Sequence, residues 1–291
     1  MTTLAATLPA WSIHPATSLG PTTLAVTDAE RALTFYRDLL GFKVLAHEQS
    51  QIKLGAGDLH LLTLLPGAAR PRKRGATGLY HVAILLPSRP HLAQILARLA
   101  AANYSIGASD HNVSEALYLS DPDDNGLEIY RDRPRAEWRY RPDGQIVMGT
   151  DRLDADGILG ELPAEPWNGM PAGTTIGHMH LQVSDLPTAE AFYHGLLGFD
   201  VMVRGYPGAL FLSAGGYHHH LGLNTWESAN GPRRPADAAG LRSFVVKLPD
   251  AAALSALRER IGAAGLPISE HDGDLTIDDP WGNQVELRIE N

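Results

Sequence analysis

The chain contains no cysteine. This absence excludes disulfide bonds, zinc sites with cysteine ligands and thiol nucleophiles. No uninterrupted apolar run of about 18 residues occurs, so no membrane helix or membrane partner is expected. An excess of basic residues is also missing, since 24 Lys and Arg stand against 33 Asp and Glu. Nucleic acid is therefore not an expected partner, because phosphate binding requires a basic surface.

The remaining composition is that of a folded globular protein. Apolar residues make up 44% of the 291 residues and charged residues 20%. At roughly 150 residues per domain, this length suggests two domains. The N-terminal sequence has no basic segment followed by an apolar run, so no signal peptide is expected. We therefore expect a cytoplasmic protein.

The sequence repeats itself at long range. Residues 27–42 (TDAERALTFYRDLLGF) align without a gap with residues 184–199 (SDLPTAEAFYHGLLGF) at an offset of 157, and eight of sixteen positions are identical. Two further pairs follow in the same order: Gly78–Pro87 with Gly240–Pro249, and the DPxxNxxE motif starting at Asp121 with the one starting at Asp279. Such a series indicates a duplication with halves of roughly 20–135 and 174–291.

Each half reads as two successive units of one strand, one helix and three shorter strands. In the third unit, Thr175–Val183 alternates as a strand does, Asp185 is a good helix N-cap, and Gly198 ends the helix. Shorter strands follow, the last one at 217–225. The prediction is an α+β protein of four βαβββ units, with an N-terminal domain at 1–135, a connector at 136–173 carrying a short helix at 151–161, and a C-terminal domain at 174–291.

Strand periodicity places several metal-binding side chains away from the helices. In strand 176–183, His178 and His180 lie on the face opposite Met179 and Leu181. The same alternation places His218 and His220 of strand 217–225, and Glu286 of the last strand, on the face that does not pack on a helix. Two histidines and one carboxylate can hold a metal ion and leave coordination positions open. The predicted ligand set is His178, His220 and Glu286.

The repeated FYxxLLGF and DPxxNxxE motifs and the His-bearing strands resemble the vicinal oxygen chelate superfamily, which includes glyoxalase I, fosfomycin-resistance proteins and extradiol dioxygenases. The segments GLYH (78–81), SEALYLSDP (114–122) and SAGGYHHH (213–220) are similar to the bacterial two-domain catechol 2,3-dioxygenase group. The resemblance covers about residues 20–290. It implies that the units pair into two domains, each a curved mixed sheet around a cavity with helices outside.

The resemblance also implies ligand positions. His178 and Glu286 match the first His ligand and the carboxylate ligand of extradiol enzymes. The second His normally lies on the first strand of the fourth unit, where this chain has Ser243, so His220 is taken as the substitute. In the first half, His81 and Glu128 occupy ligand-like positions, but Pro21 stands at the position equivalent to His178. That half is therefore predicted to be metal-free.

A histidine near the start of the strand at 217–225 is implied as acid/base catalyst. Both His218 and His219 match this position, and strand parity favours His218. The family's usual Tyr and second His in the fourth unit have no clear match, and His180 or His271 is the candidate for such a role. Candidate pocket-lining residues are Trp226, Tyr206 and Trp281, each of which also fits a core or lid position.

The function that the resemblance implies is extradiol ring cleavage of a catechol by O2 at a non-haem Fe(II), with Mn(II) as the alternative metal. The expected partners are a small aromatic diol and O2, and a homo-oligomer is compatible with an edge-rich sheet protein. Two alternatives remain open: a glyoxalase-like lyase or isomerase that uses a divalent metal as Lewis acid, and a non-enzymatic ligand-sequestering protein. The sequence does not decide which catechol is cleaved.

Overall fold

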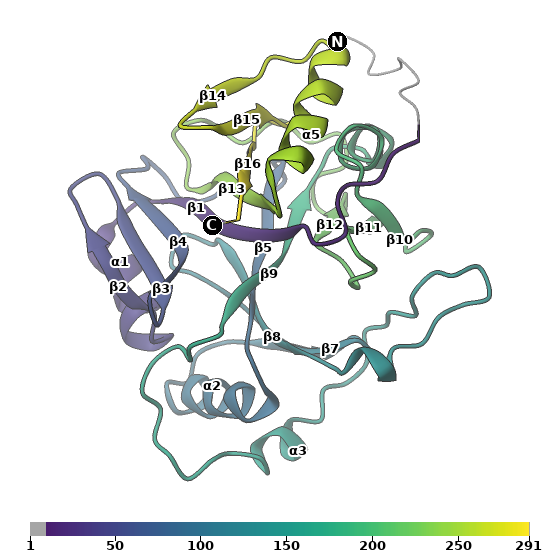
Figure 1. Cartoon of the computed structure of the whole chain (residues 1–291). Helices are drawn as coiled ribbons and strands as arrows, with labels where there is room; N and C mark the ends of the chain where they lie inside the picture. The colour runs from purple at the N-terminus through teal and green to yellow at the C-terminus, as the bar shows by residue number, and fades with distance from the viewer. Residues whose placement is uncertain (1–9, 291) are drawn as a thin grey trace.

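The computed structural model describes residues 10–290, and these form four units of the expected kind (Figure 1). The elements of the first unit are β1 (Ser18–Val26), α1 (Ala29–Leu33) continued by the π-helix η1 (Thr34–Leu39), β2 (Lys43–His47), β3 (Ile52–Ala56) and β4 (Leu59–Pro66). Those of the second unit are β5 (Gly78–Leu85), α2 (Arg89–Ala101), β6 (Gly107–Asp110), β7 (Ser114–Ser120) and β8 (Gly126–Asp132).

The second half repeats this order. The third unit consists of β9 (Thr175–Gln182), α4 (Leu186–Glu190) continued by the π-helix η3 (Ala191–Leu196), β10 (Asp200–Val203), β11 (Ala209–Ser213) and β12 (Leu221–Asn224). The fourth consists of β13 (Gly240–Leu248), α5 (Ala251–Ala263), β14 (Ser269–His271), β15 (Asp274–Asp278) and β16 (Gln284–Ile289). The predicted α+β class, with two curved mixed sheets and helices outside, is confirmed.

The two sheets each combine one unit from each half. The first has the order β14-β15-β16-β13-β1-β4-β3-β2, and the second has β10-β11-β12-β9-β5-β8-β7-β6. Antiparallel pairing of β1 with β13 joins units one and four, and that of β5 with β9 joins units two and three (Figure 1). Each sheet thus draws one unit from the predicted N-terminal domain and one from the predicted C-terminal domain. The domain limits themselves stay a prediction.

The repeated motifs hold the units of each half together. The hydroxyl of Tyr36 donates to Asp121 Oδ2 at 3.0 Å, and that of Tyr193 donates to Asp279 Oδ2 at 2.8 Å, all four residues being buried. In both pairs the tyrosine lies on the helix of one unit and the aspartate in the turn before the last strand of the next. Because successive units belong to different sheets, these buried hydrogen bonds connect the two sheets.

Local signals at the helix ends agree with the sequence. Asp185 accepts a hydrogen bond from the Thr188 amide at 2.9 Å, as the predicted N-cap. Gly198 follows the helix at φ +80°, a conformation that favours glycine. The apolar faces of helices and strands pack into one large core that includes Tyr36, Phe192 and Phe244. Across 10–290, no helix has the length and apolar character needed to cross a bilayer.

The connector packs against both halves. It contains the 3-10 helix η2 (Arg135–Glu137) and the helix α3 (Ala155–Leu159), the latter inside the predicted range 151–161. Its Ile146 amide donates to the Met202 carbonyl of β10 at 3.2 Å, and Asp151 forms a bridge with Asp110 of β6. Because β10 and β6 are the two edge strands of the second sheet, the connector lies across that sheet's open side.

Candidate metal centre and cavity

Three buried side chains meet on adjacent strands of the second sheet. His81 lies on β5, Glu128 on β8 and His178 on β9, and their exposed fractions are 5%, 2% and 1%. The Nε2 atoms of His81 and His178 both lie 3.0 Å from Glu128 Oε2. One ligand atom from each residue lies within 4.8 Å of the other two. This spacing is compact enough for a single metal ion.

The electrostatics of the cluster also suit a cation. Burial alone would raise the pKa of Glu128, but the facing His178 and His81 lower it well below the usual range, so the carboxylate is ionised. Burial lowers the pKa of His178 to about 4, although Glu128 opposes this shift. His178 is therefore neutral at neutral pH and offers a lone pair. Metal ligation requires these protonation states, a neutral imidazole and a carboxylate.

A metal ion would also satisfy an orphaned atom. His81 Nε2 is buried and makes no hydrogen bond within residues 10–290, although it lies 3.0 Å from Glu128 Oε2. Buried polar nitrogens without a partner are costly and usually mark a missing ligand, ion or water. Two imidazoles and a carboxylate match the two-His-one-carboxylate set of non-haem iron sites. The residues present therefore fit the metal that the sequence resemblance implies.

The predicted set of His178, His220 and Glu286 is not brought together. Glu286 lies on β16 of the first sheet and accepts a hydrogen bond from Arg288. His220 faces Ser213 Oγ at 3.0 Å and accepts from the Ala214 amide at 3.1 Å. The physical reason is the sheet order: β9 pairs with β5 of the second unit, not with a strand of the fourth. The half predicted to be metal-free therefore supplies two of the three clustered side chains.

The sequence did contain the signal for His81 and Glu128. Both occupy ligand-like positions of the second unit, while Ser243 and Pro21 interrupt the corresponding positions of the fourth and first units. Each half alone lacks one ligand position, and only the combination of units two and three fills all of them. This combination was not expected from the sequence, because successive units were assumed to pair within each half.

A cavity of about 430 Å³ opens beside the cluster. Its walls come from β5, β6, β7, β8, β9 and β11, from the connector and from the loops around 206, 219 and 226. The lining residues are Tyr80, His81, Gly107, Ala108, Ser109, His111, Tyr118, Glu128, Met148, Gly149, Thr150, His180, Tyr206, Phe211, His219 and Trp226. Two members of the cluster, His81 and Glu128, thus line a partly open cavity of ligand size.

Of the histidines proposed as acid/base catalyst, His219 and His180 line this cavity and His218 does not. Strand parity misplaced His218 because β12 begins only at Leu221, so residues 217–220 do not alternate as a strand. The His219 ring lies 4.0 Å from the His178 ring, centroid to centroid. His271 lies on β14 of the first sheet, is 92% exposed at its side chain and takes no part in the cavity.

His218 stands behind His219 in a hydrogen-bonded chain. Its Nε2 donates to Asp132 Oδ1 at 2.9 Å, and its Nδ1 lies 2.8 Å from His219 Nδ1. A neutral His218 that donates from Nε2 has only a lone pair left at Nδ1, so it accepts a hydrogen bond from His219 Nδ1. His219 then carries its own lone pair at Nε2. Asp132 and His218 therefore fix the tautomer of His219.

A second pair, Tyr118 and His111, lines the cavity from β7 and the turn before it. His111 Nδ1 donates to the Gly149 carbonyl at 2.6 Å, which leaves its Nε2 to accept from the Tyr118 hydroxyl. Burial, and then the charge of Glu128, raise the pKa of Tyr118 well above the usual value. The hydroxyl therefore stays protonated. The Tyr and second His that had no clear match in the fourth unit have these counterparts in the second.

His180 forms part of the wall next to the cluster. Its ring packs directly on Gly222 of β12, where a Cβ atom would lie 2.8 Å from His180 Cγ, so this position requires glycine. Trp226 and Tyr206, both proposed as lining residues, do line the cavity. Trp281 does not: it is buried, and its indole donates to Ser184 Oγ at 2.8 Å.

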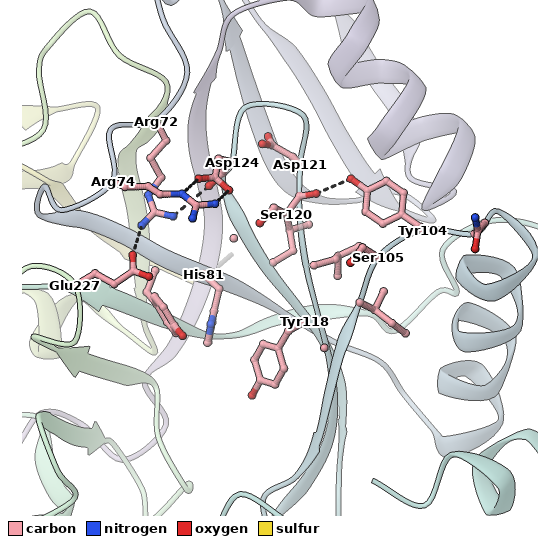
Figure 2. Close-up of a pocket in the computed structure, with 17 residues that line it drawn as sticks. Arg72, Arg74, His81, Tyr104, Ser105, Tyr118, Ser120, Asp121, Asp124 and Glu227 are labelled. Atoms are coloured by element: carbon pink, nitrogen blue, oxygen red, sulfur yellow. Dashed lines mark hydrogen bonds and ion pairs between the residues drawn. The ribbon is translucent and has the colours of Figure 1, made fainter. Parts of the chain in front are cut away.

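A wider groove adjoins the cavity and shares Tyr80, His81 and Tyr118 with it. Figure 2 shows the groove with Arg72, Arg74 and Asp124 at one side and the rings of His81 and Tyr118 pointing away from them. Arg74 Nε donates to Asp124 Oδ2 at 2.9 Å. The groove thus connects the metal cluster with a charged outer surface.

The fold and the site place the protein among vicinal oxygen chelate proteins. The model of the Glyoxalase/Bleomycin resistance protein/Dioxygenase superfamily matches residues 18–129 and again residues 175–287. The chain belongs to this superfamily, and the resemblance inferred from the motifs is confirmed.

One relative is similar over nearly the whole chain. Catechol-2,3-dioxygenase of Bacillus subtilis (strain 168) is 46% identical over 274 residues, which cover 92% of this chain and 96% of that protein. Two solved structures show the same fold at low identity. A putative dioxygenase from Bacillus subtilis subsp. subtilis str. 168 has 12% identity and a TM-score of 0.67, covering 96% of this chain and 86% of that one. Glyoxalase I from Zea mays has 16% identity and a TM-score of 0.55, covering 94% and 92%.

Proposed function

We propose that this protein is a non-haem iron dioxygenase that cleaves the ring of a catechol next to its hydroxyl groups, with O2 as the second substrate. The observation that carries the proposal is the buried cluster of His81, Glu128 and His178 beside a cavity of ligand size. The overall similarity to a protein named catechol-2,3-dioxygenase supports the same chemistry.

Fe(II) is the proposed metal, and Mn(II) is the alternative. When bound, such a metal supplies Lewis acidity and redox chemistry toward O2, with coordination positions left for substrate. His81, Glu128 and His178 would hold it. All three come from rigid neighbouring strands, so the donor atoms are positioned before the metal binds.

His219 is the proposed general base. Its Nε2 lone pair, fixed by the chain through His218 to Asp132, is available to take a proton from a catechol hydroxyl and to return it later. The three residues succeed one another from the protein surface inward, since Asp132 has a side chain 25% exposed and His218 is fully buried. Asp132 stabilises the positive charge that the histidine pair acquires when His219 takes the proton.

Tyr118 is proposed to orient the substrate from the opposite wall. Its hydroxyl remains protonated, and His111 and the Gly149 carbonyl hold it in one orientation. Because this proton is donated to His111, the phenolic oxygen is left to accept a hydrogen bond from a substrate hydroxyl. The connector, which provides Gly149, also forms part of the cavity wall and so shields that side of the reacting ring from water.

The test is oxygen uptake by protein reconstituted anaerobically with Fe(II). On addition of catechol, O2 consumption should match the appearance of a yellow ring-opened product, followed by its visible absorbance. Zinc-loaded protein is the control and should consume no O2. A fully iron-loaded protein that consumes no O2 with any of a panel of catechols would overturn the proposal and favour an oxygen-independent Lewis-acid reaction. The expected cytoplasmic location and homo-oligomeric state stay predictions.

A further inference from the structure

The cavity is larger than a bare catechol requires. Its volume of about 430 Å³ lies within the roughly 300–1,000 Å³ of pockets that enclose drug-sized ligands. A single aromatic ring seated at His81, Glu128 and His178 leaves part of this space unfilled. The remaining volume extends toward the connector and the loop that carries Trp226. A substituent on the ring is the simplest occupant.

The wall of this remaining space is aromatic. It begins at His219, whose ring lies 5.0 Å from Phe211, and continues from Phe211 to Tyr206 at 5.7 Å and from Tyr206 to Trp226 at 6.3 Å. Met148 of the connector lines the same cavity. Rings and a thioether offer dispersion contacts and little hydrogen bonding. Such a wall favours an apolar substituent.

Apart from the proposed metal ion, the cavity wall offers no cationic Lys or Arg side chain within residues 10–290. Glu128, the one carboxylate among the lining residues in that range, is a proposed metal ligand. A carboxylate on the substrate ring would therefore enter a partly desolvated space with no cationic side chain as its partner. Anionic groups in enzyme sites are normally met by Arg, whose planar fork matches a carboxylate.

The nearest basic residues lie in the adjoining groove and are already engaged. Arg72 donates to Gln182 Oε1 at 2.7 Å and to the Asp124 carbonyl at 3.1 Å, and Arg74 pairs with Asp124. Figure 2 shows both guanidinium groups on the side away from the Tyr118 ring. Neither arginine therefore provides a free partner for an anion inside the cavity.

We propose that the cavity selects catechols that carry an uncharged, apolar substituent and rejects catechols that carry a carboxylate, with Met148, Phe211 and Trp226 contacting the substituent. This inference rests on the proposed function. It adds the substrate class and identifies three specificity-determining residues.

The first test compares two substrates of the same shape. In 4-methylcatechol and 3,4-dihydroxybenzoate, a methyl group and a carboxylate occupy the same ring position. We expect kcat/KM of the iron-loaded protein to be at least about 100-fold higher for the methyl compound, because an unpaired buried charge is strongly destabilising. Equal values for the two substrates would overturn the inference.

A binding measurement separates the inference from the proposed function. Zinc-loaded protein, which should not turn over, is titrated with each of the two catechols in a calorimeter. Tighter binding of 4-methylcatechol supports the inference, and equal binding overturns it, whatever the activity. A protein that shows this binding preference but cleaves no catechol with iron bound would contradict only the proposed ring cleavage.

A charge placed at Met148 tests the residue assignment. Met148→Arg should raise kcat/KM for 3,4-dihydroxybenzoate at least about tenfold, because it gives the carboxylate a partner in the cavity wall. Met148→Leu is the matched control: it keeps an apolar side chain at this position and should give no gain with 3,4-dihydroxybenzoate. If the Met148→Arg protein binds iron normally and shows no gain with 3,4-dihydroxybenzoate, Met148 does not contact the ring substituent.

Discussion

The two sheets formed by residues 10–290 have the same construction, but only the second carries a cluster of two histidines and a carboxylate. The strand pairing of one sheet superposes on the other residue by residue. Thr23 of β1 pairs with Ser243 of β13, and His180 of β9 pairs with His81 of β5. The offsets of 157 and 162 are those of the repeated sequence motifs. Each position of the metal site therefore has a defined counterpart in the first sheet.

Two residue differences distinguish the histidine–carboxylate cluster from its counterpart in the first sheet. The counterparts of His178, His81 and Glu128 are Pro21, Ser243 and Glu286. The carboxylate is retained in both sheets, and both imidazoles are lost in the first. Proline has no donor atom, and a lone serine hydroxyl is a weak ligand for a transition metal. The fold thus positions three side chains, while their identity alone decides whether a metal can bind.

The residues around the two carboxylates, Glu286 and Glu128, also differ in charge. Glu286 accepts a hydrogen bond from Arg288, whose Nε also lies 3.0 Å from Asp274. At the position equivalent to Arg288, the second sheet has Tyr130, a neutral residue that is fully buried. A guanidinium next to the ligands would repel a divalent cation. The first sheet has therefore paired its carboxylate internally, whereas the second leaves Glu128 to the histidines.

The largest expected effect comes from the matched carboxylates. Glu128→Gln should weaken Fe(II) binding by more than the roughly 100-fold that loss of an outer partner of a metal site costs, and oxygen uptake with catechol should disappear. Glu286→Gln should retain full iron and full activity, because Arg288 and not a metal faces it. Iron content after dialysis against a chelator measures both. Loss of iron from Glu286→Gln with retention in Glu128→Gln would show that Glu286, and not Glu128, is the metal ligand.

A second pair of counterparts tests the proton-transferring residue. His219 lies two positions before Leu221, which pairs with Met179, and His60 lies two positions before Leu62, which pairs with Thr22. His219→Gln should lower kcat by about 10²–10⁴, the usual contribution of general acid–base catalysis, while iron remains bound. His60→Gln should leave kcat unchanged. A normal kcat for His219→Gln would show that a different residue acts as the general base.

Features set by neighbouring residues were predictable from the sequence. The alternation of strand 176–183 correctly placed His178 and His180 on the face away from the helix, and Asp185 formed the predicted cap. The unit pairing was not predictable in this way. Units one and three present equivalent strand edges, so local patterns do not distinguish pairing within a half from pairing across halves. His178 therefore lies beside Glu128 of the second unit and not beside Glu286.

Strand periodicity also could not predict which of the three histidines at 218–220 faces the cavity. The chain bends at Tyr217–His220 before β12 begins, and parity applies only inside a strand. Asp132, a residue with no sequence signal of its own, then determines which histidine is buried behind the other. Contacts between distant segments decide such positions, and a single sequence does not show them.

The smallest expected effect concerns an ion pair present in only one half. Arg204 makes two hydrogen bonds to Glu190, at 2.8 and 2.7 Å, while the equivalent positions of the first half are His47 and Leu33. The hydrogen bonds and charge of Arg204 lower the pKa of Glu190. Stability from this pair is therefore present above the usual carboxyl pKa and is lost as the pH falls through the lowered one.

The matched variants are Arg204→Met and His47→Met. We expect Arg204→Met to reduce the free energy of unfolding by less than about 1 kcal/mol at neutral pH, because both side chains are partly exposed and screened. The difference from the parent protein should vanish in acid, once Glu190 is protonated in both, whereas His47→Met should show no such loss over the acidic range. Denaturant titrations at a series of pH values measure this. A difference that persists unchanged into strong acid would mean that Arg204 stabilises the second half through packing of its aliphatic stem, and that the two halves differ there in contact area and not in charge.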